Sequence, residues 1–195
     1  MTRLLSLAAG VQLDVAPADM VSVAFAAGWP AVGIWFDGKT WSDSTSREVR
    51  RRLDDTGVIA LDIEPIIPSE DGNDFAEQLI EAAAVIGAQH ILFTSRLKEQ
   101  VRTTDRYQQV CEMARPHGIN VVCEFLPIFP LNTLSMAAKL LPIRGQQTAE
   151  CSLTICTCHD RAHRLKMCRQ CRSNSFPICR FVMQWQNVQP ILVAC

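Results

Sequence analysis

The sequence predicts an α/β fold in residues 1–141 and a tail of different character in residues 142–195. In the first part, short apolar segments alternate with segments of helical length, which is typical of a parallel sheet covered by helices. The tail lacks this alternation. It contains seven of the nine cysteines of the chain: Cys151, Cys156, Cys158, Cys168, Cys171, Cys179 and Cys195.

The first strand and helix are predicted from an apolar run and a glycine stop. Residues 4–8 are apolar and of strand length. Residues 1–11 also resemble a secretory signal, but no small-residue cleavage site follows, so a strand is the preferred interpretation. Residues 19–28 are expected to form a helix that ends at Gly28. Its expected apolar face consists of Met20, Val23, Phe25 and Ala27.

The second unit combines an apolar strand with a charged helix. Residues 31–36 are an apolar run that ends at Asp37 and Gly38. Residues 44–56 are expected to form a helix that ends at Gly57. Its expected features are ion pairs between residues four apart (Glu48/Arg52 and Arg51/Asp55) and an inward face with Val49 and Leu53.

Three further units complete the first part. Mainly apolar runs predict strands at residues 58–64, 90–94 and 119–125. Apolar stripes and glycine or proline stops predict helices at residues 73–86, 104–115 and 132–141. Five strand–helix units within about 140 residues leave a doubly wound sheet or a (β/α)8 barrel. No glycine-rich phosphate loop follows any strand, which weakens the doubly wound option.

Charge and hydropathy exclude several classes of partner. Residues 1–141 carry 12 basic and 18 acidic side chains, a net charge of −6, and residues 142–195 carry seven basic and two acidic, a net charge of +5; together they give the −1 of the whole chain. The acidic first part gives no reason to expect nucleic acid. No segment approaches the ~20 apolar residues of a membrane span. We expect a cytoplasmic protein with reduced cysteines. Nothing in the sequence predicts an oligomeric state.

Polar residues where parallel strands end are the candidates for a functional site. Glu124 follows a buried strand, where a carboxylate binds a metal or cation or else forms a salt bridge. Glu64, before Pro65, has the same placement, with a loop-facing or helix-capping role as the alternative. Trp35 and Asp37 are candidates for a substrate pocket, with core packing as the alternative for the tryptophan.

Other polar and aromatic residues are given weaker roles. Trp41 is a second tryptophan near a strand end, with the same two interpretations. Thr94 and Ser95 also follow a strand, and no role is assigned to them. His90 begins a strand and His117 precedes one, so both are expected at the end of the sheet away from the site and are interpreted as structural.

Residues 118–127, residues 63–65 and the strand–helix repeat resemble the sugar phosphate isomerase/epimerase family of xylose-isomerase-like TIM barrels. The resemblance covers residues 1 to about 141. It implies about five units of a partial (β/α)8 TIM barrel, which an irregular cysteine-rich tail follows. It implies a divalent metal (Mn, Mg, Co or Zn) and a small sugar or hydroxy-keto acid as substrate. Glu124 matches the metal-binding glutamate at the end of strand five. Glu124 and Glu64 are the catalytic candidates.

This sequence departs from the family pattern after strand five. The family's other metal ligands come from strands six to eight, and the sequence as written has none of them. The resemblance therefore implies an isomerase or epimerase that is inactive as written. The alternative enzyme class is an endonuclease IV-like phosphodiesterase. It requires several metal-binding histidines, and His90 and His117 are the only histidines in residues 1–141.

The tail has two competing interpretations. A zinc-binding interaction module would use soft ligands within residues 156–171: Cys156, Cys158, His159, His163, Cys168 and Cys171. Alternatively, the tail is the same gene translated out of frame after a slip between Leu140 and Glu150. A one-base shift of residues 151–159 can spell an apolar strand that ends in Asp-x-x-His, the family's strand-six pattern, and residues 176–184 can spell another acid-tipped strand. We prefer the frame error, which predicts a poorly stable chain that binds metal weakly.

Overall fold

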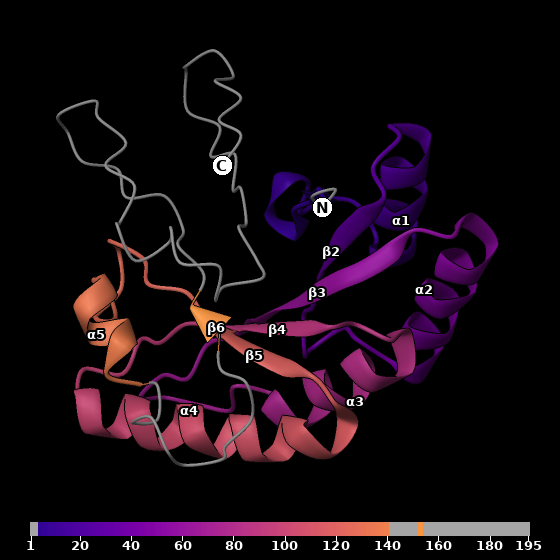
Figure 1. The fold of residues 1–195 in the computed structure, drawn as a ribbon. Coiled ribbons are helices and arrows are strands. Elements are labelled where there is room, and N and C mark those ends of the chain that lie inside the picture. Colours follow the sequence, from indigo (N-terminus) through magenta and orange to yellow (C-terminus); the bar gives the residue numbers. More distant parts are fainter. Residues whose placement is uncertain (1–3, 141–151, 154–195) are drawn as a thin grey trace, which may run out of the picture.

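The computed structural model describes residues 4–140 and the pair Ser152–Leu153. Parallel strands form one six-stranded sheet in the order of the sequence (Figure 1). They are β1 (Ser6–Leu7), β2 (Ala31–Trp35), β3 (Ile59–Ile66), β4 (His90–Phe93), β5 (Asn120–Cys123) and β6 (Ser152–Leu153). A doubly wound sheet would reverse its strand order at a switch point. The unbroken order confirms the α/β class and a partial barrel, and β6 adds two residues from the tail.

Helices follow β2, β3, β4 and β5, as the alternation predicts. The helical segments are η1 (Ala9–Val11), α1 (Pro17–Ala26), α2 (Asp43–Thr56), α3 (Ala76–Ile86), α4 (Gln100–Ala114), η2 (Arg115–His117) and α5 (Leu134–Ala138). Figure 1 shows α1 to α4 along one side of the sheet. Within the part of the chain that the structure describes, no helix has the length and apolar character needed to cross a membrane.

Local capping explains where α2 begins and where α2 and α3 end. The Ser42 hydroxyl accepts a hydrogen bond from the Thr45 amide at 3.3 Å, which satisfies one of the free amides at the start of α2. Gly57 ends α2 and Gly87 ends α3, with φ of 71° and 72° in the left-handed region that glycine tolerates. Both glycine stops are confirmed.

The apolar face predicted for the first helix is confirmed at Met20 but wrong at Phe25 and Ala27, which are exposed. The buried residues of α1 are Met20, Val21 and Ala24, whereas Phe25 is 58% exposed. Residues 23, 25 and 27 are spaced by two, which is the period of a strand and spreads side chains around a helix. The buried set follows helical spacing instead.

The two faces of the sheet differ in chemistry. On the side covered by helices, the strands contribute apolar side chains to the core, namely Ile34, Ile63, Ile91, Phe93, Val121 and Cys123. Their neighbours along each strand point to the opposite face, which we call the inner face. The register shifts between Val32 and Gly33, so that Val32 pairs with Ala60 and Gly33 with Asp62. Leu61 is therefore an extra residue in β3, and this bulge sets which residues after it face inward.

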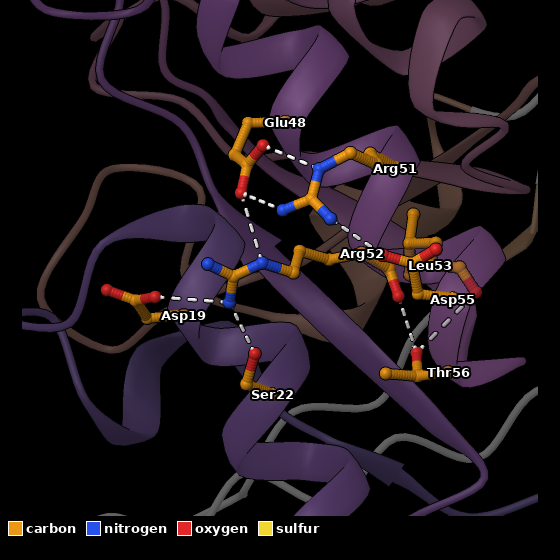
Figure 2. A network of polar contacts seen from close by, with 8 residues as sticks. All are labelled: Asp19, Ser22, Glu48, Arg51, Arg52, Leu53, Asp55 and Thr56. Carbon is orange, nitrogen blue, oxygen red and sulfur yellow. Dashed lines mark hydrogen bonds and ion pairs between the residues drawn. The ribbon is translucent and has the colours of Figure 1, made fainter.

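A polar clamp joins α1 to α2 (Figure 2). The Arg52 side chain of α2 donates hydrogen bonds to Ser22 Oγ at 2.6 Å and to Asp19 Oδ1 at 3.3 Å, both on α1. The same guanidinium bonds Glu48 one turn earlier at 3.0 Å. The predicted pairs Glu48/Arg52 and Arg51/Asp55 are both present.

Candidate functional site

The inner face carries polar side chains on three neighbouring strands. Register pairs place Gly33, Asp62, His90 and Asn120 in one row across β2 to β5. Closer to the carboxyl ends of the strands, Glu64 pairs with Trp35, and Thr94 and Glu124 follow β4 and β5 directly. Functional residues of parallel barrels lie at this end of the strands.

Glu64 is held within β3. Its carbonyl oxygen accepts a hydrogen bond from the Phe36 amide at 2.7 Å, and the residue is 6% exposed. The strand continues to Ile66, so Glu64 lies two residues before the strand ends rather than at its tip. Trp35, its register neighbour on β2, is half-buried on the same face.

Glu124 is the first residue after β5. Its amide donates a hydrogen bond to the Phe93 carbonyl at 2.8 Å, which continues the pairing of β4 and β5, and the residue is 7% exposed. Alternation from Cys123, which faces the helices, directs Glu124 to the inner face. The structure thus brings both candidate carboxylates to one face. Their strands, β3 and β5, lie on either side of β4, so that two strand spacings of about 10 Å in total separate the strands.

Asp37 and Trp41 have local roles. Asp37 is exposed, and its Oδ1 accepts a hydrogen bond from the Lys39 amide at 3.0 Å within the turn after β2. The Trp41 ring packs 5.0 Å from the Phe36 ring, and its Nε1 donates to Ser46 Oγ at 2.8 Å. Trp41 therefore belongs to the core, and Asp37 caps a turn at the edge of the site.

The floor of the inner face holds an unusual buried pair. Asp62 and His90 are register neighbours and are 5% and 7% exposed. Burial lowers the pKa of His90 from 6.5 to about 4, so the imidazole is neutral at pH 7. A Cβ on Gly33 would lie 2.8 Å from Asp62 Oδ1, so only glycine leaves room for this carboxylate. From the sequence, Asp62 receives no role; the one local signal is that this aspartate interrupts the apolar run 58–64.

The described residues do not by themselves provide a metal site. Within 4–140 there is no group of three or more His, Cys, Asp or Glu side chains placed to hold a metal ion. Protein zinc sites use three or four such ligands. Glu64 and Glu124 therefore fit part of a ligand set at most. The cysteines and histidines proposed as zinc ligands in the tail lie outside the described residues, as does the suspected frame slip.

A surface hollow of about 440 Å3 lies elsewhere, between the β3–α3 loop and α4. Its arginines are already paired with carboxylates. Arg106 Nη2 and Nε contact Asp74 at 2.7 and 2.8 Å, and Arg102 pairs with Glu70. These pairs fasten the loop to α4, so the hollow offers no unpaired arginine to an anion.

Comparison with known proteins identifies the fold. No family model matches the sequence, and no curated protein matches it. Solved structures do match. A xylose isomerase-like TIM barrel/4-hydroxyphenylpyruvate dioxygenase fusion protein has a TM-score of 0.65 and 18% identity over 80% of this chain and 27% of its own. A xylose isomerase domain-containing protein from Salmonella typhimurium has a TM-score of 0.63 and 14% identity over 80% of this chain and 62% of its own.

The IolI protein, in a structure with a bound zinc atom, gives a TM-score of 0.63 and 14% identity over 78% of this chain and 62% of its own. The chain has the xylose isomerase-like TIM barrel fold. It spans less than two thirds of these three structures, so it corresponds to part of such a barrel. A probable 3-DHS dehydratase from Bacillus anthracis and a family 2 AP endonuclease from Brucella melitensis share the fold. A xylose isomerase-like barrel thus supports several chemistries, and its fold alone does not select one.

Proposed function

We propose that this chain carries the first five units of a metal-dependent isomerase or epimerase that acts on a small sugar or hydroxy-keto acid. The observation that supports this is the burial of Glu64 and Glu124 on one face, at the end of the sheet where barrels of this kind bind substrate.

The chemistry that these side chains can perform is proton transfer. One carboxylate removes a proton from the carbon next to the substrate carbonyl. In an epimerisation a proton is returned to the opposite face of the same carbon. In an isomerisation a proton is returned to the former carbonyl carbon, and the proton of the neighbouring hydroxyl moves to the former carbonyl oxygen. The reaction consumes no oxidant or reductant. A positioned carboxylate contributes roughly 10²- to 10⁴-fold to such a step, so some activity can remain when other groups are missing.

The metal site is the part of the proposed enzyme that the described residues supply least completely. Glu124 is the residue of 4–140 that would contribute to a metal site, and a bound divalent ion would polarise the substrate oxygens. The remaining ligands are not found among the described residues. We therefore expect weak metal binding and slow but measurable turnover by the chain as written.

Deuterium exchange into the substrate tests the proposal, because it detects proton transfer even when the exchange rate is low. The full chain, D-xylose or hydroxypyruvate and Mn²⁺ are incubated in D₂O, and NMR follows deuterium entry next to the carbonyl. We expect slow exchange above the protein-free blank, reduced at least about tenfold by E124Q or E64Q. E112Q, which changes an exposed glutamate of α4, is the matched control. Exchange no faster than the blank would contradict the proposed function.

A phosphodiesterase of the AP endonuclease type is less well supported. Such an enzyme needs metal-binding histidines near the carboxylates, and 4–140 contains only His90 and His117. His90 begins β4 and His117 precedes β5, so both lie at the amino ends of the strands, opposite Glu124. A zinc module in the tail remains a separate proposal. It is tested by measuring the zinc content of the refolded chain.

A further inference from the structure

The loop between β3 and α3 ends in a residue with a strained backbone. Phe75, directly before α3, has φ of 54° and ψ of 26°, in the left-handed region that bulky side chains rarely adopt. Its ring packs against the core and lies over Gly38 in the turn after β2. Strained residues persist where their surroundings hold them, and they cluster at clamps and switch regions. Phe75 is therefore a fixed point from which the loop before it can move.

The segment before Phe75, residues 69–74, has no apolar side chain, and we call it the strap. It consists of Ser69, Glu70, Asp71, Gly72, Asn73 and Asp74. Directly before the strap, the Pro68 carbonyl accepts a hydrogen bond from the Arg96 amide at 2.9 Å, so the chain is still tied to the segment after β4. A segment that buries no apolar side chain opens at a lower free-energy cost than a core strand.

Polar contacts hold the strap on α4. The Asp74 carboxylate accepts hydrogen bonds from Arg106 at 2.7 and 2.8 Å, and Glu70 pairs with Arg102. Glu70 also accepts a hydrogen bond from the Lys98 amide at 3.3 Å. The Asp74 side chain is 5% exposed, whereas those of Glu70 and Arg102 are 37% and 49% exposed. Salt therefore screens the Glu70 pair more strongly than the Asp74 pair.

The strap spans a gap rather than a packed interface. The hollow of about 440 Å3 lies between the strap and α4, and its lining includes the side of Leu97. Where atoms are missing beneath a segment, the dispersion contacts that would hold it are missing too. The strap follows the carboxyl end of β3, which carries Glu64, so its position sets part of the rim of the candidate site.

We propose that the strap opens as a unit about Phe75 when its ion pairs with Arg102 and Arg106 break. The closed and open positions differ in charge pairing rather than in buried apolar area, so salt shifts the balance toward the open position. The rim of the inner face is then movable on the side of β3. The inference concerns the movement of a loop and holds whether or not the chain has the proposed activity.

Amide hydrogen exchange of the full chain, followed by NMR, tests the opening. The Lys98 amide loses its bond to Glu70 when the strap opens, so it should exchange together with the amides of 69–74. The neighbouring Leu97 amide donates to Ser95 Oγ at 3.1 Å and should not follow them.

An arginine variant and salt should both raise the open fraction. R106Q removes the bonds to Asp74 but leaves the hydrogen bond from the Ala76 amide to Asp74 Oδ1, which caps α3. We expect R106Q to speed exchange in 69–74 and at Lys98 roughly tenfold. NaCl at about 0.5 M should speed it at least about twofold in the wild type. R47Q, at an exposed arginine of α2, is the matched control and should change neither rate.

The inference fails if strap amides exchange equally fast in R106Q and the wild type, or if salt leaves their rates unchanged. Faster exchange in R106Q at the Leu79 amide, which donates to the Phe75 carbonyl at 2.9 Å, would place the movement in α3 and overturn the hinge. If R106Q does not fold, the salt dependence of the wild type decides. Strap amides that exchange no faster than those of β2 to β4 in the wild type would show global unfolding instead of a local opening.

Discussion

Single buried residues on the inner face set the chemistry and part of the stability of this chain. His90 is the clearest case, because burial favours its neutral form and lowers its pKa to about 4. In the unfolded chain the same imidazole regains an ordinary pKa of about 6.5. Between these values the unfolded state binds a proton that the folded state does not.

Acid should therefore destabilise the fold through His90. The contribution of His90 to the free energy of unfolding is complete above pH 6.5. It is lost as the pH falls toward 4, because the unfolded state then binds a proton that the folded state does not. We expect a loss of about 2 kcal/mol between pH 6.5 and 5 from this residue. Urea denaturation at both pH values measures it. H90Q should flatten the difference, and H117Q, at an exposed histidine, should keep it. If the stability of H90Q depends on pH as strongly as that of the wild type, His90 is not the cause of the loss in acid.

At the residue scale, the sequence predicted the carboxylates but not their neighbours. Glu64 and Glu124 could be found because each interrupts an apolar strand near its end. The inward direction of Asp62 could not be found, since it depends on the bulge at Leu61 and on the register with β2. That the buried hydroxyl of Thr94 has no hydrogen-bond partner among the described residues likewise cannot be found from the sequence.

Among the elements, local signals were predictable and contacts between elements were not. The stop of α2 at Gly57 follows from the sequence, whereas the start of α3 does not. Phe75, expected within that helix, precedes it in the left-handed region with φ of 54°. Its ring lies against Gly38, where an added Cβ would come within 2.3 Å of it. A contact between residues so far apart in the chain leaves no local pattern.

The clamp between α1 and α2 gives a prediction at this scale. Arg52 is 29% exposed and bonds both helices, whereas the bonds of Arg51, to Glu48 and Asp55, stay within α2. We expect R52A to lower the free energy of unfolding by about 1 kcal/mol, because Ser22 and Glu48 lose a partner. R51A should leave the denaturation midpoint nearly unchanged, since exposed pairs within one helix contribute little. Equal effects of both variants in urea denaturation would show that the clamp does not stabilise the contact.

For the molecule as a whole, we expect closure of the sheet to limit stability. Among the described strands, β1 pairs only with β2, and β6 only with β5. Leu4 and Leu5, just before β1, are 43% and 52% exposed. A complete barrel has no such edges, because its first and last strands pair. The change of composition after residue 141 predicts an open sheet of this kind, and this stays a prediction.

Replacement of the tail tests whether closure limits stability and metal binding. We expect the chain as written to unfold over a broad temperature range, because the edges of its sheet are open. We also expect it to bind Mn²⁺ or Zn²⁺ weakly, because its ligand set is incomplete. A second chain carries, after residue 140, the translation of the same gene in the shifted frame. It should melt cooperatively and bind one divalent ion, as followed by calorimetry and titration. E124Q in this second chain should remove the ion, because Glu124 is its proposed strand-five ligand. Cooperative melting of the chain as written, with one ion bound, would refute the frame error and the incomplete site together.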